Sequence, residues 1–175
     1  IREGQANELT LSGIALSDVT PPVELSLILA RMAAGVAVKI ACFGDSTTDG
    51  NQTTGWSANP KNGNGTAIGT RDQNLFALNA WPAKLELILQ DVFDVTNITT
   101  WNAGYSGQRM DNGWAVANYQ AAVINTYGIP DIVFIGFGLN DIQDAGSQID
   151  AHVEQTEILL NRVISEGTTP VLLTN

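Results

Sequence analysis

Residues 36–50 read VAVKIACFGDSTTDG, and this stretch decides the fold. Its first eight residues, 36–43, form a short apolar run rich in Val and Ile, which is typical of a buried β-strand. A polar loop follows at once, from Gly44 to Gly50. We predict that the run is one strand of a parallel α/β sheet, because reactive groups in such sheets gather where the strands end.

Apolar runs and helical patterns alternate along the rest of the chain. The apolar runs predict three further strands, at 94–101, 131–137 and 170–174. The helical patterns begin at Pro82, at residue 113 and after Ser147. Strands separated by helices in this way indicate an α/β fold with a parallel sheet.

The segments around the first strand complete the expected organisation. Pro21 and Pro22 precede a helical pattern that ends at Gly35, so we expect a leader and a helix over 1–36 and one α/β domain over 37–175. Residues 51–80 are rich in Asn, Gly and Thr and form a long insertion. Loops of such length inside a compact domain are usually functional or disordered.

Composition excludes several classes of partner. The 175 residues carry 8 Lys and Arg against 18 Asp and Glu, a formal net charge of −10, which would repel a phosphate backbone, so we expect no nucleic-acid partner. No apolar stretch approaches the roughly 20 residues of a membrane span. One Cys and one His cannot form an intrachain disulfide or an ordinary zinc site, so we expect neither metal nor cofactor, and Cys42 is expected to be a buried, inert thiol.

Polar, glycine-containing loops follow the first three predicted strands. They are Gly44 to Gly50, Asn102 to Gly107 and Gly138 to Asp141. Each loop alone has the composition of an ordinary turn. Because the carboxyl ends of parallel strands meet at one edge of a sheet, the three loops are expected to converge there.

Taken in order, these loops resemble the three sequence blocks of the SGNH hydrolases, also called the GDSL esterases and lipases, from about residue 37 to the end. The resemblance implies a three-layer, flavodoxin-like fold and a serine esterase. Ser46 would be the nucleophile, and the oxyanion would be held by the backbone N–H groups of Ser46 and Gly107 and by the side-chain amide of Asn140. The remaining block residues would shape the loops: Asp45, Gly104 and Asp141.

The family's fourth block, an Asp-x-x-His that activates the serine, has no counterpart in this sequence. The one histidine, His152, lies in the helix after the third strand, and we expect a partly exposed surface residue rather than the base. We therefore expect an incomplete hydrolase without the last strand and helix of the fold. Its Asp and His would come from a separate polypeptide or a missing segment.

The substrate is predicted from the insertion. It is polar, with Trp56 near its start and Trp81 just past its end, which suits sugar rings better than lipid. We expect acyl esters, above all acetyl esters of a carbohydrate or surface polysaccharide. The alternatives are a non-catalytic carbohydrate-binding module on the same fold, and a lipid or thioester hydrolase. The acidic, Cys-poor composition favours an extracellular, cell-surface or virion-associated protein.

Overall fold

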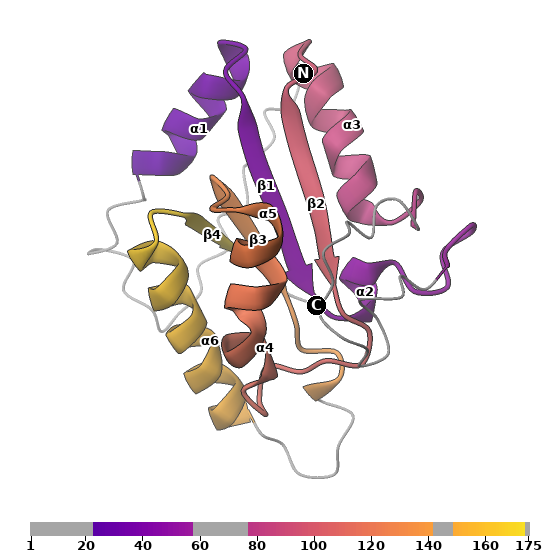
Figure 1. Ribbon diagram of the computed structural model, residues 1–175, viewed down its shortest axis with the longest axis vertical. Helices are drawn as coiled ribbons and strands as arrows, with labels where there is room; N and C mark the ends of the chain where they lie inside the picture. The colour runs from indigo at the N-terminus through magenta and orange to yellow at the C-terminus, as the bar shows by residue number, and fades with distance from the viewer. Residues whose placement is uncertain (1–22, 58–76, 142–148, 174–175) are drawn as a thin grey trace, which may run out of the picture.

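A four-stranded parallel sheet forms the centre of the structure (Figure 1), a computed structural model that describes residues 23–57, 77–141 and 149–173. The strand order is β2-β1-β3-β4, which is the order of flavodoxin-like sheets. The strands are β1 (Val38–Gly44), β2 (Ile98–Gly104), β3 (Ile132–Gly136) and β4 (Thr169–Leu172). The predicted parallel α/β architecture is therefore confirmed.

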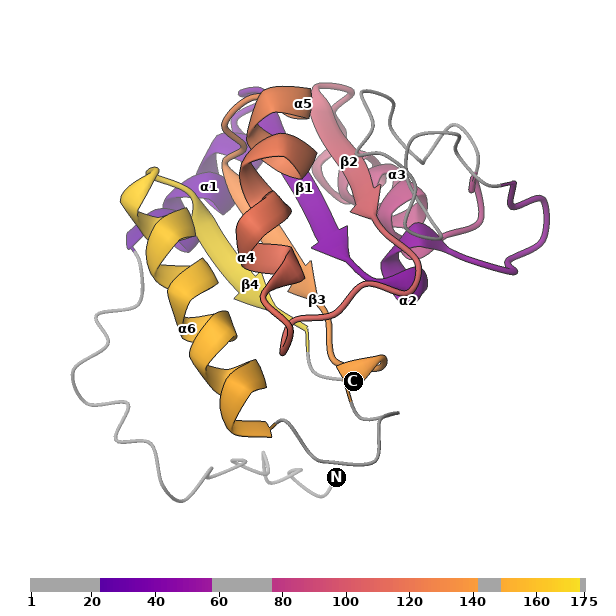
Figure 2. The ribbon, with the colours of Figure 1, turned by 60° about the horizontal axis from the view of Figure 1, so that its bottom comes forward.

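Helices cover both faces of the sheet. In Figure 2, the helices of one layer lie in front of the strands and those of the other layer lie behind. The rear layer consists of α1 (Val23–Ala33) and α3 (Trp81–Phe93). The front layer consists of α4 (Trp114–Tyr119), the π-helical turn η2 (Gln120–Ile124), α5 (Asn125–Tyr127) and α6 (Ile149–Ser165). These are the three layers that the family resemblance implied.

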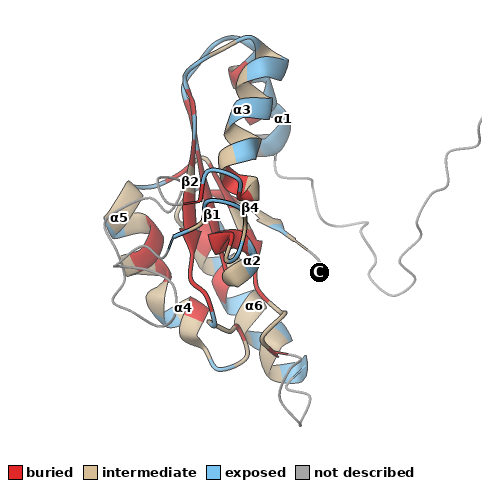
Figure 3. Ribbon diagram, turned by 90° about the vertical axis from the view of Figure 1, so that its right-hand side faces the viewer, coloured by how far each residue is buried: buried red, intermediate tan, exposed pale blue. Residues whose placement is uncertain are grey.

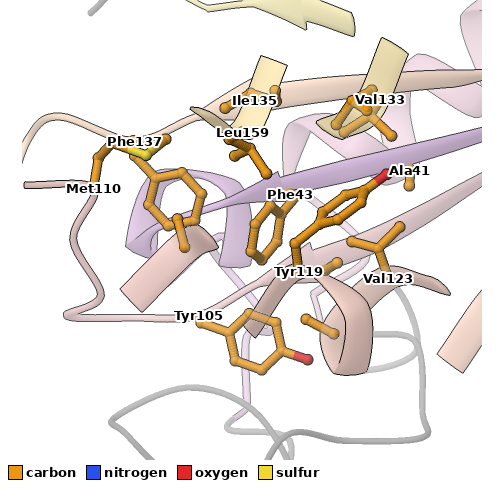
Figure 4. Close-up of a cluster of buried hydrophobic side chains, with 14 residues drawn as sticks. Ala41, Phe43, Tyr105, Met110, Tyr119, Val123, Val133, Ile135, Phe137 and Leu159 are labelled. Atoms are coloured by element: carbon orange, nitrogen blue, oxygen red, sulfur yellow. The ribbon is translucent and has the colours of Figure 1, made fainter. Parts of the chain in front are cut away.

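Two apolar clusters hold the layers together, one on each side of the sheet. The strands between them are buried, whereas the outer surfaces of α1 and α3 are exposed (Figure 3). Phe43 of β1 lies in the front cluster. The centroid of its ring is 5.8 Å from that of Tyr119 and 4.9 Å from that of Phe137 (Figure 4). The next residue, Gly44, ends the strand, so the aromatic centre of the front cluster lies beside the first polar loop. Cys42 faces the rear cluster and is buried, as predicted.

Three of the four predicted strands lie within two residues of the observed bounds, but the prediction of a strand over 94–101 was wrong at both ends, because β2 runs from Ile98 to Gly104. Asp94 ends α3 in the left-handed region, with φ 52°, and its N–H donates to carbonyls of the last turn. The Val95 N–H also donates to that turn, at 3.0 Å from Gln90 O. The helix end therefore uses these residues, and β2 begins only at Ile98.

The helix predicted from residue 113 to 127 is interrupted. Its middle, η2, has π-helical hydrogen bonds, including one from Asn125 N–H to Gln120 O. Arg162 of α6 donates to Gln120 Oε1 at 2.6 Å and to Val116 O at 3.4 Å, the carbonyl that residue 120 would bond in a regular α-helix. Arg162 thus binds this segment from another helix, which the sequence pattern of the segment does not reveal.

Some predictions fall outside the described residues. They are the leader over 1–20, most of the insertion over 51–80 and the start of the last helix at Ser147. Within the described residues, no helix has the length and hydrophobicity that a bilayer crossing requires.

Candidate active site

The first polar loop contains a short helix, α2 (Ser46–Asp49), directly after β1. Asp45 caps it: its Oδ1 accepts hydrogen bonds from the backbone N–H and the hydroxyl of Thr47, both at 2.9 Å. Ser46 is the first helical residue and is half-buried. The first N–H groups of a helix have no partner within the helix. The Ser46 N–H is one of these groups, and it lies at the N-terminal end of α2, directly after β1.

Glycines allow α2 to lie against the ends of the strands. A Cβ atom on Gly104 would lie 2.1 Å from the backbone nitrogen of Asp49, and one on Gly44 would lie 2.2 Å from Thr48 Oγ1 and 2.5 Å from Gly136 O. Real Cβ atoms do not approach other atoms so closely. Gly44 and Gly104 therefore let the helix that carries Ser46 pack directly on the sheet, beside β1 and β2 (Figure 1).

A buried hydrogen bond joins the first loop to the second. The Ser106 hydroxyl donates to Asp49 Oδ2 at 2.5 Å and accepts from the Asn51 amide at 3.2 Å. Ser106 and Asp49 are both buried, and burial raises the pKa of the Asp49 carboxyl, although the hydrogen bond from Ser106 opposes that rise. Ser106 immediately precedes Gly107, so this bond anchors the peptide that carries the Gly107 N–H.

Gly107 has a backbone conformation that favours glycine. Its φ is 80°, in the left-handed region, and a Cβ atom there would meet no other atom within 4 Å. The glycine is therefore needed for its backbone angle and not for lack of space. It is exposed, with open space in front of it.

Two side chains join the third loop to the second. Asn140 Nδ2 donates to Gln108 O at 2.8 Å, which uses one of the two N–H groups of its amide. The buried Asp141 carboxylate accepts from the backbone N–H groups of Met110, at 3.1 Å, and Asp111, at 2.6 Å. Asp141 thus shapes the loops, as the sequence predicted, and Asn140 is held by the residue after Gly107.

Acidic groups determine the electrostatics of this region. Burial raises the pKa of the Asp45 carboxyl; hydrogen bonds from Thr47 and the Leu139 backbone oppose the rise, and the charge of Asp141 adds to it. The Arg109 guanidinium, 2.8 Å from an oxygen of Asp111, lowers the pKa of that carboxyl. In the described part of the chain, no group of three or more His, Cys, Asp or Glu is placed to hold a metal ion.

His152 lies beside this network. As predicted, its side chain is partly exposed, at 31 %, but it has a partner that the sequence analysis missed: its Nδ1 lies 3.0 Å from Asp141 Oδ1. Eleven residues separate the two in sequence, and they meet because α6 begins beside the loop that follows β3 (Figure 2). The helical pattern places His152 on a flank of α6 without indicating what that flank contacts.

The two tryptophans expected to contact sugar have different surroundings. Trp81 begins α3, is partly buried and packs edge-on against Phe134 of β3, with ring centroids 5.8 Å apart, so part of its ring lies against the rear core cluster. Trp56 follows α2 and is half-buried, and its indole Nε1 is buried without a hydrogen-bond partner in the described structure.

Three residues named from the sequence thus lie after three neighbouring strands. Ser46 follows β1, Gly107 follows β2 and Asn140 follows β3, and the two buried bonding networks tie their loops together. The sequence matches the family of GDSL-like lipases and acylhydrolases over residues 40–169. The chain belongs to this family.

Solved structures agree with this assignment at the level of the fold. The GDSL-family chain is similar to the tail fibre protein gp63.1 of an E. coli phage (TM-score 0.72, 22% identity, 87% of this chain and 19% of that one). It is also similar to a two-domain esterase, CEX, active on acetylated mannans (TM-score 0.57, 22% identity, 85% of this chain and 33% of that one). A third similar structure is that of LAE5, an α/β hydrolase from the metagenome of Lake Arreo, Spain (TM-score 0.56, 21% identity, 82% of this chain and 62% of that one). The chain therefore spans less than two thirds of each of these proteins. Comparison with curated proteins finds no significant match.

Proposed function

We propose that this GDSL-family protein is a serine esterase in which Ser46 attacks the carbonyl carbon of an acyl ester. The observation that carries the proposal is the packing of α2 on the sheet through Gly44 and Gly104, which brings Ser46 to the same sheet edge as the loops of Gly107 and Asn140. A serine nucleophile and neutral N–H donors gathered at one sheet edge are groups that acyl transfer uses.

The chemistry follows from the types of residue. Attack by Ser46 Oγ places a negative charge on the carbonyl oxygen, and the N–H groups of Ser46, Gly107 and the Asn140 amide stabilise it. These donors are neutral, so they avoid the desolvation cost of a buried cation. Collapse of the intermediate breaks the bond to the alcohol, which leaves with the serine's proton, and water then hydrolyses the acyl-serine and restores Ser46.

The proton requires a base, and we assign that role to a histidine on a further segment or polypeptide. The one histidine of this sequence, His152, is bound through Nδ1 to Asp141, and none of its contacts in the described structure is to Ser46. A serine hydroxyl is a weak nucleophile until a positioned base accepts its proton. The companion segment would bring its own Asp to orient the histidine.

For the substrate we propose an acetyl ester of a carbohydrate, at an extracellular or virion surface. The polar composition of residues 51–80 supports a hydrophilic ligand. Two proteins with a similar fold, the esterase active on acetylated mannans and the phage tail fibre, are in keeping with such a setting. Acetate release from acetylated polysaccharide should exceed hydrolysis of long-chain esters, and a preference for long chains would instead indicate a lipid hydrolase.

Ser46 can be tested with a fluorophosphonate, which labels only an activated serine. In the natural protein we expect one labelled peptide, which contains Ser46, and no labelling of the Ser46→Ala variant. The control is Ser165→Ala, which removes an exposed hydroxyl at the end of α6 and should leave labelling unchanged. Absence of labelling in the natural protein would favour a carbohydrate-binding module that does not catalyse.

Asn140 provides a second test, aimed at the oxyanion hole. Asn140→Ala should lower kcat by about 100- to 1,000-fold with little change in KM, because the lost donor acts on charge that develops in the transition state. Steady-state kinetics on an acetyl ester measures both constants. A change confined to KM would show that Asn140 binds substrate and does not stabilise the oxyanion.

A further inference from the structure

His152 ends a series of hydrogen bonds that runs through both loops of the proposed oxyanion hole. Its Nδ1 bonds Asp141, whose carboxylate also accepts the N–H groups of Met110 and Asp111 at 3.1 and 2.6 Å. The donors thus come from two places in the chain, the loop after β2 and the first turns of α6. One buried carboxylate holds all three segments together.

Asp141 depends on these donors. It is 6 % exposed, and a buried carboxylate without enough hydrogen bonds is unfavourable by several kcal/mol in general. The carboxylate can only accept, so the His152 ring must carry a hydrogen on Nδ1 in this arrangement. Within the described residues, two of these donors are backbone N–H groups, those of Met110 and Asp111. The third is the His152 side chain, which belongs to α6.

The positions of both oxyanion donors depend on this anchor. Asn140 precedes Asp141 in the chain, and its amide bonds Gln108 O, one residue after Gly107. The far end of the same loop, at Met110 and Asp111, is fixed by Asp141 itself. A shift of the Asp141 carboxylate would therefore move Asn140 directly and the Gly107 loop through its two attachments.

We propose that His152 is a positioning residue for the oxyanion hole: its Nδ1–H holds the Asp141 carboxylate and thereby fixes Asn140 and the loop that bears Gly107. The role rests on the proposed function of Ser46, Gly107 and Asn140. It uses Nδ1 as a donor, and no proton passes from Ser46 to the ring. His152 accordingly acts on the reaction through Asp141 and touches no reacting atom.

Three substitutions separate positioning from base catalysis. In His152→Asn the side-chain amide nitrogen occupies nearly the place of Nδ1 and can still donate to Asp141, but it cannot serve as a base. His152→Gln has its amide nitrogen near the place of Nε2, and His152→Ala has no donor. Measured on the natural protein with an acetyl ester, Ala and Gln should lower kcat by about 10- to 100-fold with KM nearly unchanged, since a displacement of about 1 Å can cost roughly 100-fold in rate.

His152→Asn should restore most of the lost kcat. If Asn is as slow as Ala, the donor bond to Asp141 is not what His152 supplies, and the proposal is wrong. If all three variants match the wild type, it is wrong as well. The control is Glu154→Ala, an exposed substitution two residues further along α6, which should leave both constants unchanged.

Hydrogen exchange tests the same bond without substrate. The amide hydrogens of Met110 and Asp111 should exchange faster in His152→Ala than in the wild type and at the wild-type rate in His152→Asn. This result does not depend on esterase activity, so it distinguishes the two proposals. If Ser46 proves unreactive, exchange still reports whether His152 holds the loop, whereas unchanged exchange in His152→Ala overturns the positioning role even if Ser46 is the nucleophile.

Discussion

At the scale of single residues, the burial of Asp49 should affect the pH dependence of stability. It is completely buried, and burial raises the pKa of its carboxyl in the folded protein above the value of about 3.9 that an unfolded chain has. Between these two values the folded state binds more protons than the unfolded state. The contribution of Asp49 to the unfolding free energy is therefore greatest below the unfolded pKa and is lost as the pH rises through the folded pKa.

Asp49→Asn should weaken this dependence. We expect the unfolding free energy of the wild type, relative to that of the variant, to decrease as the pH is raised from about 4 through the folded pKa, because only the wild type must ionise a buried carboxyl. Urea denaturation at a series of pH values measures the difference. Asp91→Asn, which removes an exposed carboxylate of α3, controls for the change in net charge. Parallel curves for the wild type and Asp49→Asn would contradict the prediction.

The site could be predicted from the sequence only as far as its local motifs reach. Ser46, Gly107 and Asn140 lie in short blocks that follow apolar runs, so their positions at strand ends could be read from the pattern. The bonds from Ser106 to Asp49 and from His152 to Asp141 join residues 57 and 11 positions apart, and nothing local specifies them. Sequence pattern thus indicated the groups proposed to act on the substrate, whereas the groups that hold them required the tertiary structure.

At the scale of elements, the packing of α2 on β2 depends on Gly104. The nearest atoms to a Cβ there belong to the backbone of Thr48 and Asp49, which cannot rotate away as a side chain would. Gly104→Ala should therefore lower the unfolding free energy by about 3 kcal/mol, the upper part of the usual range for overpacking, and should also reduce fluorophosphonate labelling of Ser46, since α2 must move.

Gly128→Ala is the matched control for this change. Gly128 has φ 84° and ψ −176°, a backbone conformation that is essentially restricted to glycine, and it has open space around it. Alanine there should therefore cost only backbone strain, roughly 1–3 kcal/mol, and leave labelling intact. Denaturant unfolding and labelling should be measured on both variants. Equal losses of stability, with Ser46 labelled in both, would show that α2 tolerates displacement from β2.

The same elements show where sequence-based prediction of the fold fails. Apolar runs identified β1, β3 and β4 because buried parallel strands are apolar on both faces, whereas the segment around β2 is rich in Thr and was predicted less closely. The start of β2 was wrong because Asp94 and Val95 complete the last turn of α3, and η2 was missed because apolar periodicity does not distinguish a π-helical turn from an α-helical one. Boundaries and irregular turns depend on such capping and tertiary bonds, which periodicity does not encode.

At the scale of the whole molecule, the dominant property is the net charge of −10. Composition alone predicted it, and the structure adds that several acids lie among the loops of the proposed site, where Arg109 is paired with Asp111. The acids beside the loops of Ser46 and Asn140 add to the negative electrostatic potential of the whole protein. A low-dielectric site lined by one sign of charge concentrates that potential. Anionic substrates should therefore be disfavoured even where their size would fit.

This field can be measured with two esters of the same alcohol, one carrying a neutral acetyl group and the other a succinyl group with a free carboxylate. At an ionic strength of about 10 mM the Debye length is roughly 30 Å and the protein's charge acts over its whole width, whereas at about 150 mM it falls to roughly 8 Å. Raising the salt should increase kcat/KM for the succinyl ester several-fold and leave that of the acetyl ester nearly unchanged, because only the anion is repelled on approach. If both esters responded equally, salt would be acting on the enzyme's stability or on the chemical step, and the acidic surface would have no part in selecting the substrate.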